Sequence, residues 1–269
     1  MPQYKKYKKY KKYKKYGRGN LKPAPDSYVK RDYRLTVGAA GFSTFQVKVK
    51  ETDLLIMAPV DVNGLAYDLV HRYRNQLENY INHNPAFQSS LQPLDIDRLA
   101  PPIVKDMFKA SATAGVGPMA AVAGAVAEYV GGGLLAEAGI EEVVVENGGD
   151  IFLHRREDCR IAVFAGPSPL SNKVGVKVKA AAMPMGVCTS SASVGHSLSF
   201  GAADAVTVLA ANTALADAAA TRLGNEVGRD CPLSQALDTA REISGIRGVV
   251  IIRGEDIGAW GEIELVDLA

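Results

Sequence analysis

The sequence is poor in the features that mark secreted, disulfide-rich and membrane proteins. Its 269 residues include only three cysteines, Cys159, Cys188 and Cys231, with no Cys-x-x-Cys spacing. A long chain with so few cysteines is typical of a reducing compartment, so we expect a cytoplasmic protein. No apolar run reaches the roughly 18 residues that a membrane-spanning helix needs, and the closest, residues 116–127, is shorter. No apolar segment follows the charged N-terminus, which argues against a signal peptide.

The composition and charge are those of a globular domain with a basic tail. Hydrophobic residues make up 47% and charged residues 22%, which excludes a wholly disordered or collagen-like chain. Nine of the 31 Lys and Arg residues lie in residues 1–20, which contain no acid. The rest of the chain therefore has 22 basic against 29 acidic residues, a net charge of −7. The overall charge of +2 consequently says little about what the folded part binds.

The basic tail is a Tyr-Lys-Lys repeat that runs from Tyr4 to Tyr16. A period of three matches neither helix nor strand, so we predict a disordered tail and linker over residues 1–25. Tyrosines among lysines can stack on single-stranded bases or lie on an anionic membrane surface. Charge runs are more often simply solvated, so nucleic-acid binding through residues 1–16 is the less favoured interpretation.

Hydrophobic patterning after the tail predicts one α+β domain over residues 26–269. Strands are predicted at residues 33–37, 42–50, 54–58, 142–146, 151–154, 160–165, 174–179, 186–189, 205–209, 249–252 and 262–266. Helices are predicted at residues 65–81, 110–138, 212–223 and 234–243. Asn63 is the expected N-cap of the first helix, and the proline-spotted residues 86–102 are expected to form a loop.

The helix predicted over residues 110–138 consists mostly of small residues, and Gly131 to Gly133 are expected to end or bend it. Such a helix is usually buried against other backbones. The sequence leaves open whether it packs inside its own domain or against a second copy of the chain, as in a homo-oligomer.

A first candidate site is the segment Asn147, Gly148, Gly149 and Asp150, which lies between two predicted strands. Two glycines let a backbone approach a ligand closely, and the flanking Asn and Asp supply polar side chains. The same sequence is also typical of a tight hairpin turn, and taken alone it favours the turn.

A second candidate is the segment over residues 189–201, which begins with Thr189, Ser190 and Ser191 and contains His196. Hydroxyls and exposed backbone amides suit phosphate or carboxylate oxygens. His196 is the candidate general acid or base because an unperturbed imidazole titrates near neutral pH. A polar loop with local hydrogen bonds is the equally favoured alternative.

A third candidate is the pair Asp217 and Thr221, which stand four residues apart in an Ala-rich helix. This spacing places both oxygens on one face, one turn apart. Burying an unpaired carboxylate is costly, and a hard cation such as Mg²⁺ would offset that cost. In the alternative interpretation, Asp217 complements the helix dipole and Thr221 bonds back to a carbonyl. The residues alone leave both open.

Taken in order, these segments resemble the ApbE-type FAD:protein FMN transferases, and more closely a shorter, cytosolic and largely uncharacterised branch of that superfamily. The resemblance spans residues 115–228 and rests chiefly on Gly-Gly-Asp-Ile at 148–151 and Ala-Asp-Ala-Ala-Ala-Thr at 216–221. It implies an ApbE-like α+β fold of mixed or antiparallel sheets with interspersed helices.

The resemblance also implies a function for the three candidate segments. Asp217 and Thr221 would ligate Mg²⁺ beside a flavin pyrophosphate, and residues 147–150 would shape the same pocket. In the transferases the metal assists attack of a target-protein threonine hydroxyl on FAD, which attaches FMN and releases AMP. The expected ligand is therefore FAD or FMN or another phosphate-bearing molecule, and the expected reaction, if this chain is an enzyme, is flavin transfer.

Two departures from the transferase pattern support an alternative. The Lys-Gly pair and following Asp of the transferases are replaced within residues 118–124, and the segment after His196 lacks their Asp-Pro. The shorter branch is associated with sulfide-dependent homocysteine formation together with other proteins. The alternative is thus a non-flavin accessory protein or enzyme in sulfur amino-acid biosynthesis.

Overall fold

The computed structural model describes residues 41–191 and 201–269. These residues belong to one compact unit that extends over residues 31–269. The tail predicted over residues 1–25 and the strand expected at 33–37 lie outside the described residues.

The core of the unit is an eight-stranded sheet with the order β1-β2-β3-β4-β7-β8-β9-β10. All of its described pairings are antiparallel. The strands are β1 Ser43–Val49, β2 Thr52–Ala58, β3 Val143–Asn147, β4 Asp150–His154, β7 Met185–Ser190, β8 Ala205–Ala210, β9 Ile246–Arg253 and β10 Asp256–Gly261. The sequence predicted seven of these strands and missed β10.

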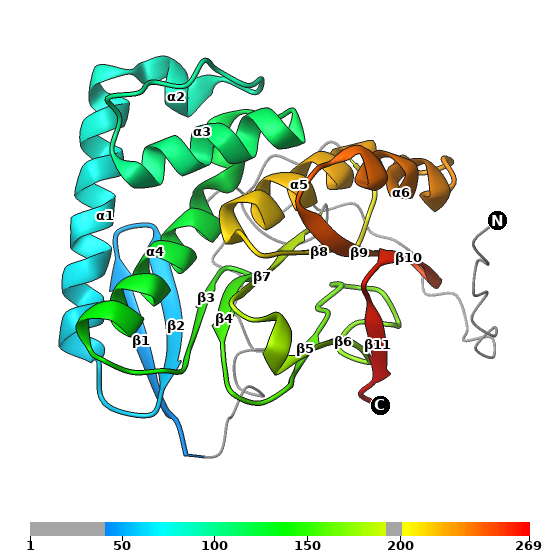
Figure 1. The fold of residues 1–269 in the computed structure, drawn as a ribbon. Coiled ribbons are helices and arrows are strands. Elements are labelled where there is room, and N and C mark those ends of the chain that lie inside the picture. The colour runs from blue at the N-terminus through cyan, green and yellow to red at the C-terminus, as the bar shows by residue number, and fades with distance from the viewer. Residues whose placement is uncertain (1–40, 192–200) are drawn as a thin grey trace. The chain divides into compact units, whose positions relative to one another are not determined.

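Six described helices lie on one side of this sheet (Figure 1). They are α1 Asn63–His83, α2 Pro85–Ser89, α3 Pro102–Ala114, α4 Val122–Glu137, α5 Thr213–Glu226 and α6 Leu233–Glu242. Of these, α1, α4, α5 and α6 pack against the strands of the sheet, and α2 and α3 pack on the other helices. The expected loop over residues 86–102 was wrong in part, because α2 forms there. The N-cap of α1 is Val62 rather than Asn63, whose backbone N–H instead bonds the Asp61 carboxylate.

A second sheet of three strands, in the order β11-β6-β5, covers the opposite face. Its strands are β5 Cys159–Ala162, β6 Val174–Val178 and β11 Glu264–Asp267. The segment between β4 and β5 carries the chain from one sheet to the other, because β4 pairs with β7 and β5 pairs with β6.

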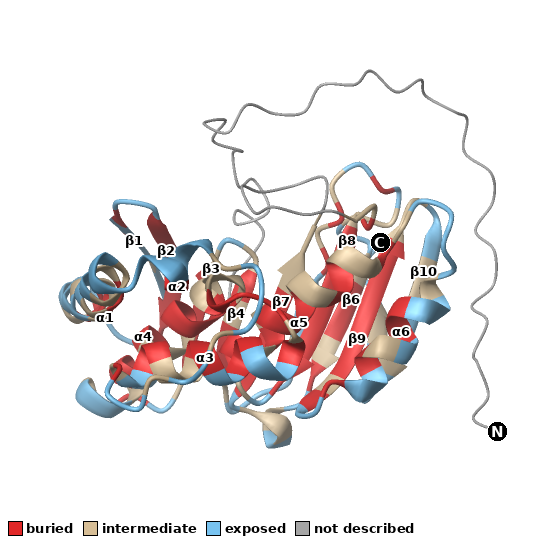
Figure 2. Cartoon of the chain, turned by 90° about the horizontal axis from the view of Figure 1, so that it is seen from above, coloured by how far each residue is buried: buried red, intermediate tan, exposed pale blue. Residues whose placement is uncertain are grey.

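Alternation along the strands divides the core into two sides. Val143 and Val145 of β3 pack under the helices, whereas Val144 between them packs toward the small sheet. Buried residues therefore lie on both faces of the central strands of the large sheet (Figure 2). This burial on both faces explains the nearly continuous apolar runs of its central strands.

The helix α4 continues through Gly131 to Gly133, which the sequence analysis expected to end or bend it. A Cβ at Gly131 would lie 2.3 Å from the Phe152 ring, and one at Gly133 would lie 2.8 Å from Leu69. These two glycines therefore let α4 pack closely against β4 and α1. Gly131 and Gly133 are therefore explained by packing, because neighbouring side chains occupy the space that a larger residue would need.

The apolar stretch around α4 is also longer than the sequence analysis expected. Residues Pro118–Glu137 are long and apolar enough to cross a membrane, and half of their most apolar window is buried inside the domain. A buried core helix meets the same criterion, so this one stretch is weak evidence for a membrane span. Its position among α1, α5 and β3 is that of a core helix.

Two glycines of α4 give a direct test of this packing. A Cβ at Gly124 would lie 2.4 Å from the Thr213 carbonyl oxygen, whereas Gly132 has open space around it. We expect Gly124→Ala to lower the free energy of unfolding by about 1–3 kcal/mol, because it forces α4 and α5 apart. Gly132→Ala should raise it by about 0.5–1 kcal/mol through helix propensity. Urea denaturation measures both, and equal effects would contradict the close approach.

Candidate functional site

Two carboxylates lie together where α5 packs against the beginning of β4 and the end of β7. Asp150 is the first residue of β4 and is 8% exposed. It pairs with Cys188 of β7, and directly opposite residues project from one face, here the helix-covered face. Asp217 belongs to the second turn of α5, and its Oδ2 accepts a hydrogen bond of 2.9 Å from the Gly124 backbone N–H. We refer to Asp150 and Asp217 as the carboxylate pair.

The pKa values show that the pair is electrostatically linked. Burial raises the pKa of Asp217 to about 7, although hydrogen bonds from the α4 backbone oppose the rise. Burial also holds the pKa of Asp150 well above its usual value, and the Asp217 charge raises it further. The pKa of the Cys188 thiol is raised by burial and then by both carboxylates. At neutral pH such a pair favours a bound proton or a cation.

The segment over residues 147–150 is the tight hairpin that the sequence allowed. Gly148 and Gly149 have φ angles of +70° and +107°, and Asn147 pairs with Asp150 across the turn. Two central residues with positive φ define the turn type that joins twisted strands most readily. The Asn147 Nδ2 donates to the Ala123 carbonyl oxygen at 3.0 Å, which ties the turn to the start of α4. The turn thereby holds Asp150 at the beginning of its strand.

The end of β7 presents its residues to opposite faces of the sheet. The Thr189 hydroxyl lies 2.9 Å from that of Thr207 on the face away from the helices, while the Thr189 backbone hydrogen-bonds Asp150. Ser190 lies on the helix face, where a Cβ at Gly224 of α5 would come within 3.3 Å of its Oγ. Of these two candidate residues, Ser190 has its hydroxyl on the side of the carboxylate pair. Thr189 contributes its backbone there.

The remaining candidate residues lie around the same end of α5 or beyond the described chain. Thr221 is half-buried, one turn after Asp217, and its hydroxyl makes no hydrogen bond to residues 41–191 or 201–269. The structural alternative for Thr221, a hydrogen bond from its hydroxyl back to a helix carbonyl, is thus absent among those residues. Ser191 follows β7 directly, and His196 lies outside the described residues, so the catalytic role of His196 stays a prediction.

A residue that the sequence analysis missed, Glu128 of α4, binds the beginning of α5. Its Oε2 accepts hydrogen bonds from the backbone N–H groups of Thr213 at 2.7 Å and Ala214 at 3.3 Å. Its Oε1 accepts from Asn212 Nδ2 at 3.3 Å, and the Asn212 side chain caps α5 by accepting from the Leu215 N–H. The N-terminus of α5 is therefore already satisfied without Asp217. Glu128 was detectable as the only charge in the interior of an apolar helix, because the other acid of α4, Glu137, is its last residue.

The hydrogen bonds of Glu128 and Gly124 fix one turn of α4 against one turn of α5. Gly124 contacts Asp217, and Glu128 contacts Thr213, so both helices use residues four positions apart. Two contacts one turn apart fix the rotation of α5 as well as its position. That rotation determines that Asp217 faces the sheet.

The oxygen donors of the site suit a hard cation that is also coordinated by oxygens of a bound ligand. No cluster of three or more His, Cys, Asp and Glu that could hold a metal occurs within the described ranges. Mg²⁺ commonly takes one or two carboxylates and completes its shell with waters and phosphate oxygens. Asp150, Asp217 and the Thr221 hydroxyl offer only oxygen donors of that kind. The residues present therefore fit Mg²⁺ and do not fit a structural zinc site.

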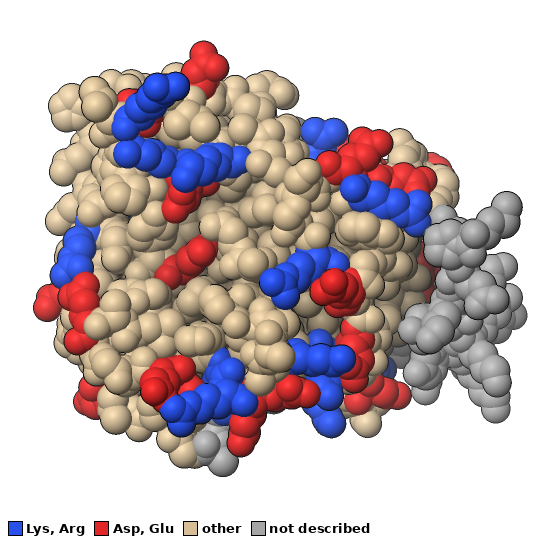
Figure 3. Space-filling view, viewed as in Figure 1, with Lys and Arg blue, Asp and Glu red and all other residues tan. Residues whose placement is uncertain are grey.

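The charged surface does not resemble that of a nucleic-acid-binding protein on the face shown in Figure 3. Lys and Arg side chains lie there beside Asp and Glu side chains rather than in a patch of one sign. Ion pairs among the described residues, such as Arg74 with Glu51 and Glu78, show the same mixing of the two signs. Among the residues drawn in colour, this face carries no broad basic surface of the kind that follows phosphates.

Comparison with known sequences identifies relatives over most of the chain. A family model described as AbpE bacteria matches residues 35–252. A UPF0280 protein of Methanocaldococcus jannaschii is 43% identical over 230 residues, which cover 82% of this chain and 92% of that protein. A UPF0280 protein of Methanosphaerula palustris is 46% identical over 190 residues, which cover 71% of this chain and 78% of that protein.

Comparison with solved structures identifies the fold. The apo form of the flavinyl transferase ApbE of Pseudomonas stutzeri matches with a TM-score of 0.55 and 14% identity, covering 82% of this chain and 94% of that one. A variant of the flavin transferase ApbE from Vibrio cholerae matches with a TM-score of 0.53 and 14% identity, covering 82% and 97%. At such identities the likeness concerns the fold alone. The predicted ApbE-like α+β fold is thereby confirmed.

The capping role of Glu128 predicts a loss of stability. We expect Glu128→Ala to lower the free energy of unfolding by about 1–2 kcal/mol, because backbone donors of α5 lose their acceptor. The matched control is Glu137→Ala on the same helix, whose exposed ion pair with Arg72 is screened by solvent. It should change stability far less. Equal losses in chemical denaturation would contradict the capping role.

The raised pKa of Asp217 predicts a pH-dependent stability in the absence of divalent ions. The folded state binds this proton more tightly than the unfolded state, so stability should fall as the pH rises from about 4 to 7. For one group the slope is at most about 1.4 kcal/mol per pH unit. Asp217→Asn should flatten it, whereas Asp238→Asn on α6 should not. Denaturation in EDTA over this range measures the slope, and an unchanged slope in Asp217→Asn would refute the assignment.

Proposed function

The chain belongs to the family described as AbpE bacteria, and from that premise we propose that it binds a flavin or another phosphate-bearing ligand at a Mg²⁺-assisted site. The observation that carries the proposal is the carboxylate pair, in which Asp150 is buried at the beginning of β4 and Asp217, half-buried on α5, lies close enough to raise the pKa of Asp150. Two neighbouring carboxylates whose pKa values burial raises are suited to a hard cation, which stabilises their charged forms. The site lies in the domain that we assign to residues 26–269, with residues 1–25 as a tail.

Each candidate residue has a role in this proposal. Asp217 and Thr221 would ligate Mg²⁺. Asp150, the first residue of β4, would add a second negative charge to the metal site. The turn over residues 147–150 shapes the pocket wall. Ser190 and Ser191 offer hydroxyl donors to phosphate oxygens at the end of β7, and the Thr189 backbone N–H holds Asp150 in place. Mg²⁺, when bound, supplies Lewis-acid stabilisation of phosphate charge and a template for the ligand.

The reaction that we propose for this site is transfer of FMN from FAD to a protein hydroxyl. A threonine oxygen of the acceptor forms a bond to the FMN phosphorus, the pyrophosphate P–O bond breaks, and AMP leaves. His196 accepts the proton of the attacking hydroxyl. The ligands thus include FAD, and the partner is an acceptor protein in the cytoplasm. The flavin transferases among the structural neighbours support the proposal through the shared fold only.

Binding of FAD, followed by flavin fluorescence with Mg²⁺ and with EDTA, tests the site. We expect Mg²⁺ to tighten binding, and Asp217→Asn to weaken it at least tenfold and to remove the Mg²⁺ dependence. Asp238→Asn, an exposed carboxylate on α6, should behave like the wild type. Mass spectrometry of a threonine-bearing acceptor after incubation with FAD then tests transfer.

Two outcomes would contradict parts of the proposal. Unchanged affinity and Mg²⁺ dependence in Asp217→Asn would show that the metal assignment is wrong. An absence of FAD binding in both conditions would favour the alternative role, a non-flavin accessory protein or enzyme in sulfide-dependent homocysteine formation. Growth of a deletion strain without homocysteine or methionine would then be the decisive measurement.

A further inference from the structure

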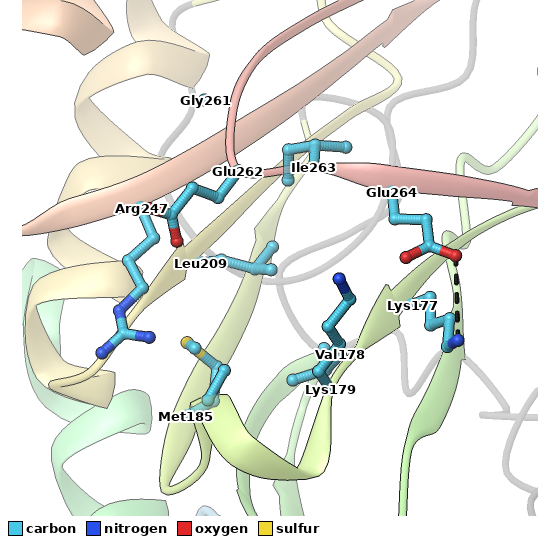
Figure 4. A pocket seen from close by; sticks show the side chains of 11 residues that line it. Lys177, Val178, Lys179, Met185, Leu209, Arg247, Gly261, Glu262, Ile263 and Glu264 are labelled. Carbon is cyan, nitrogen blue, oxygen red and sulfur yellow. Dashed lines mark ion pairs between the residues drawn. The ribbon is translucent and has the colours of Figure 1, made fainter.

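A cavity of about 390 Å³ opens between the small sheet and the large sheet, apart from the carboxylate pair (Figure 4). It is lined by Met185 at the beginning of β7, whose side chain packs toward the small sheet. Cys188, the partner of Asp150, lies three residues further along β7, or about 10 Å, and faces the helices. The cavity and the carboxylate pair therefore lie on opposite faces of the sheet.

One wall of the cavity is held rigidly by the connection from β10 to β11. Gly261 has a φ of +88°, and a Cβ there would lie 2.2 Å from the Arg247 carbonyl oxygen. The Glu262 N–H donates to that same oxygen at 2.8 Å. The Ile263 side chain covers Gly248, where a Cβ would come within 2.6 Å of it. The hollow is thus formed by fixed backbone.

The charges around the cavity are unevenly paired. Lys177 is neutralised by Asp158 at 2.9 Å and by Glu264 at 3.8 Å. Lys179 and Arg247 form no ion pair with the described residues, and they extend along opposite sides of the cavity (Figure 4). Glu262 also lacks an ion pair there and offsets one of these charges. Counted together, these three cations and three acids sum to zero, but Lys179 and Arg247 are the two cations that no acid among the described residues holds in an ion pair.

The floor between these cations is apolar. Met185 and Leu209 lie between Arg247 and Lys179, and Ile263 closes the far side (Figure 4). The guanidinium fork of arginine recognises carboxylate and phosphate oxygens, and an apolar floor accommodates a hydrocarbon group. We propose that this cavity binds a small amphipathic anion, a carboxylate or phosphomonoester that carries an apolar group.

The proposal is tested with the dye 8-anilinonaphthalene-1-sulfonate, an amphipathic anion whose fluorescence rises in apolar sites. Arg247→Gln and Lys179→Gln should each weaken dye binding at least fivefold. Ala182→Leu, which narrows the cavity without removing a charge, should weaken it similarly. The matched control, Arg229→Gln, removes an exposed arginine that is not among the lining residues and should leave binding unchanged.

Competition with eight-carbon ligands identifies the head group. Displacement of the dye by octanoate or by octyl phosphate supports the proposal. The one that binds more tightly shows whether the cavity prefers a carboxylate or a phosphate head group. Equal displacement by neutral 1-octanol overturns it, because charge recognition is then absent. Dye binding that survives both Arg247→Gln and Ala182→Leu also overturns it. Arg247→Gln should leave Mg²⁺-dependent FAD binding unchanged, so failure here is separable from failure of the proposed function.

Discussion

The contact between α4 and α5 is the constraint on which the candidate site depends. Glycine at position 124 allows the two helices to approach, and Glu128 accepts from the first backbone N–H groups of α5. Because these contacts join side-chain carboxylates to backbone, they set the rotation of α5 without requiring bulky residues. Asp217 consequently faces the sheet, where Asp150 begins its strand. The packing of α4 against α5 therefore decides whether the two carboxylates meet, and the chemistry of the site follows from that packing.

Close packing also explains why the carboxylates are so strongly perturbed. α5 meets the sheet through small residues, and Gly186 of β7 lies directly against Thr213. This packing removes the two carboxylates from bulk water, and a desolvated carboxylate holds its proton more tightly. The same Ala-rich surface that looks featureless in the sequence thus creates the electrostatic character of the site. A bound cation would take the place of the proton, and oxygens of nearby backbone and hydroxyl groups could ligate it as well.

Much of the fold could be predicted from local patterns, whereas errors arose where distant segments decide the outcome. Alternation located most strands, but β5 pairs with β6 and not with β4, which no local pattern reveals. α3 was largely missed because the prolines at its start were taken as loop. Spacing and order identified Asp217, yet the face on which Thr189 lies depends on a register that one residue inverts. The capping role of Glu128 could not be predicted, because it depends on which helix packs against α4.

The long sequence separation of these contacts has a consequence for how the protein is made. Gly124 and Asp217 are 93 positions apart, and Glu128 and Thr213 are 85 apart. During synthesis, α4 and the β3–β4 hairpin leave the ribosome well before α5 exists. Until α5 packs, Asp150 lacks both the burial and the neighbouring Asp217 charge that raise its pKa in the folded chain. The carboxylate pair can therefore form only after α5 has docked, and its raised pKa values would report that this packing is complete.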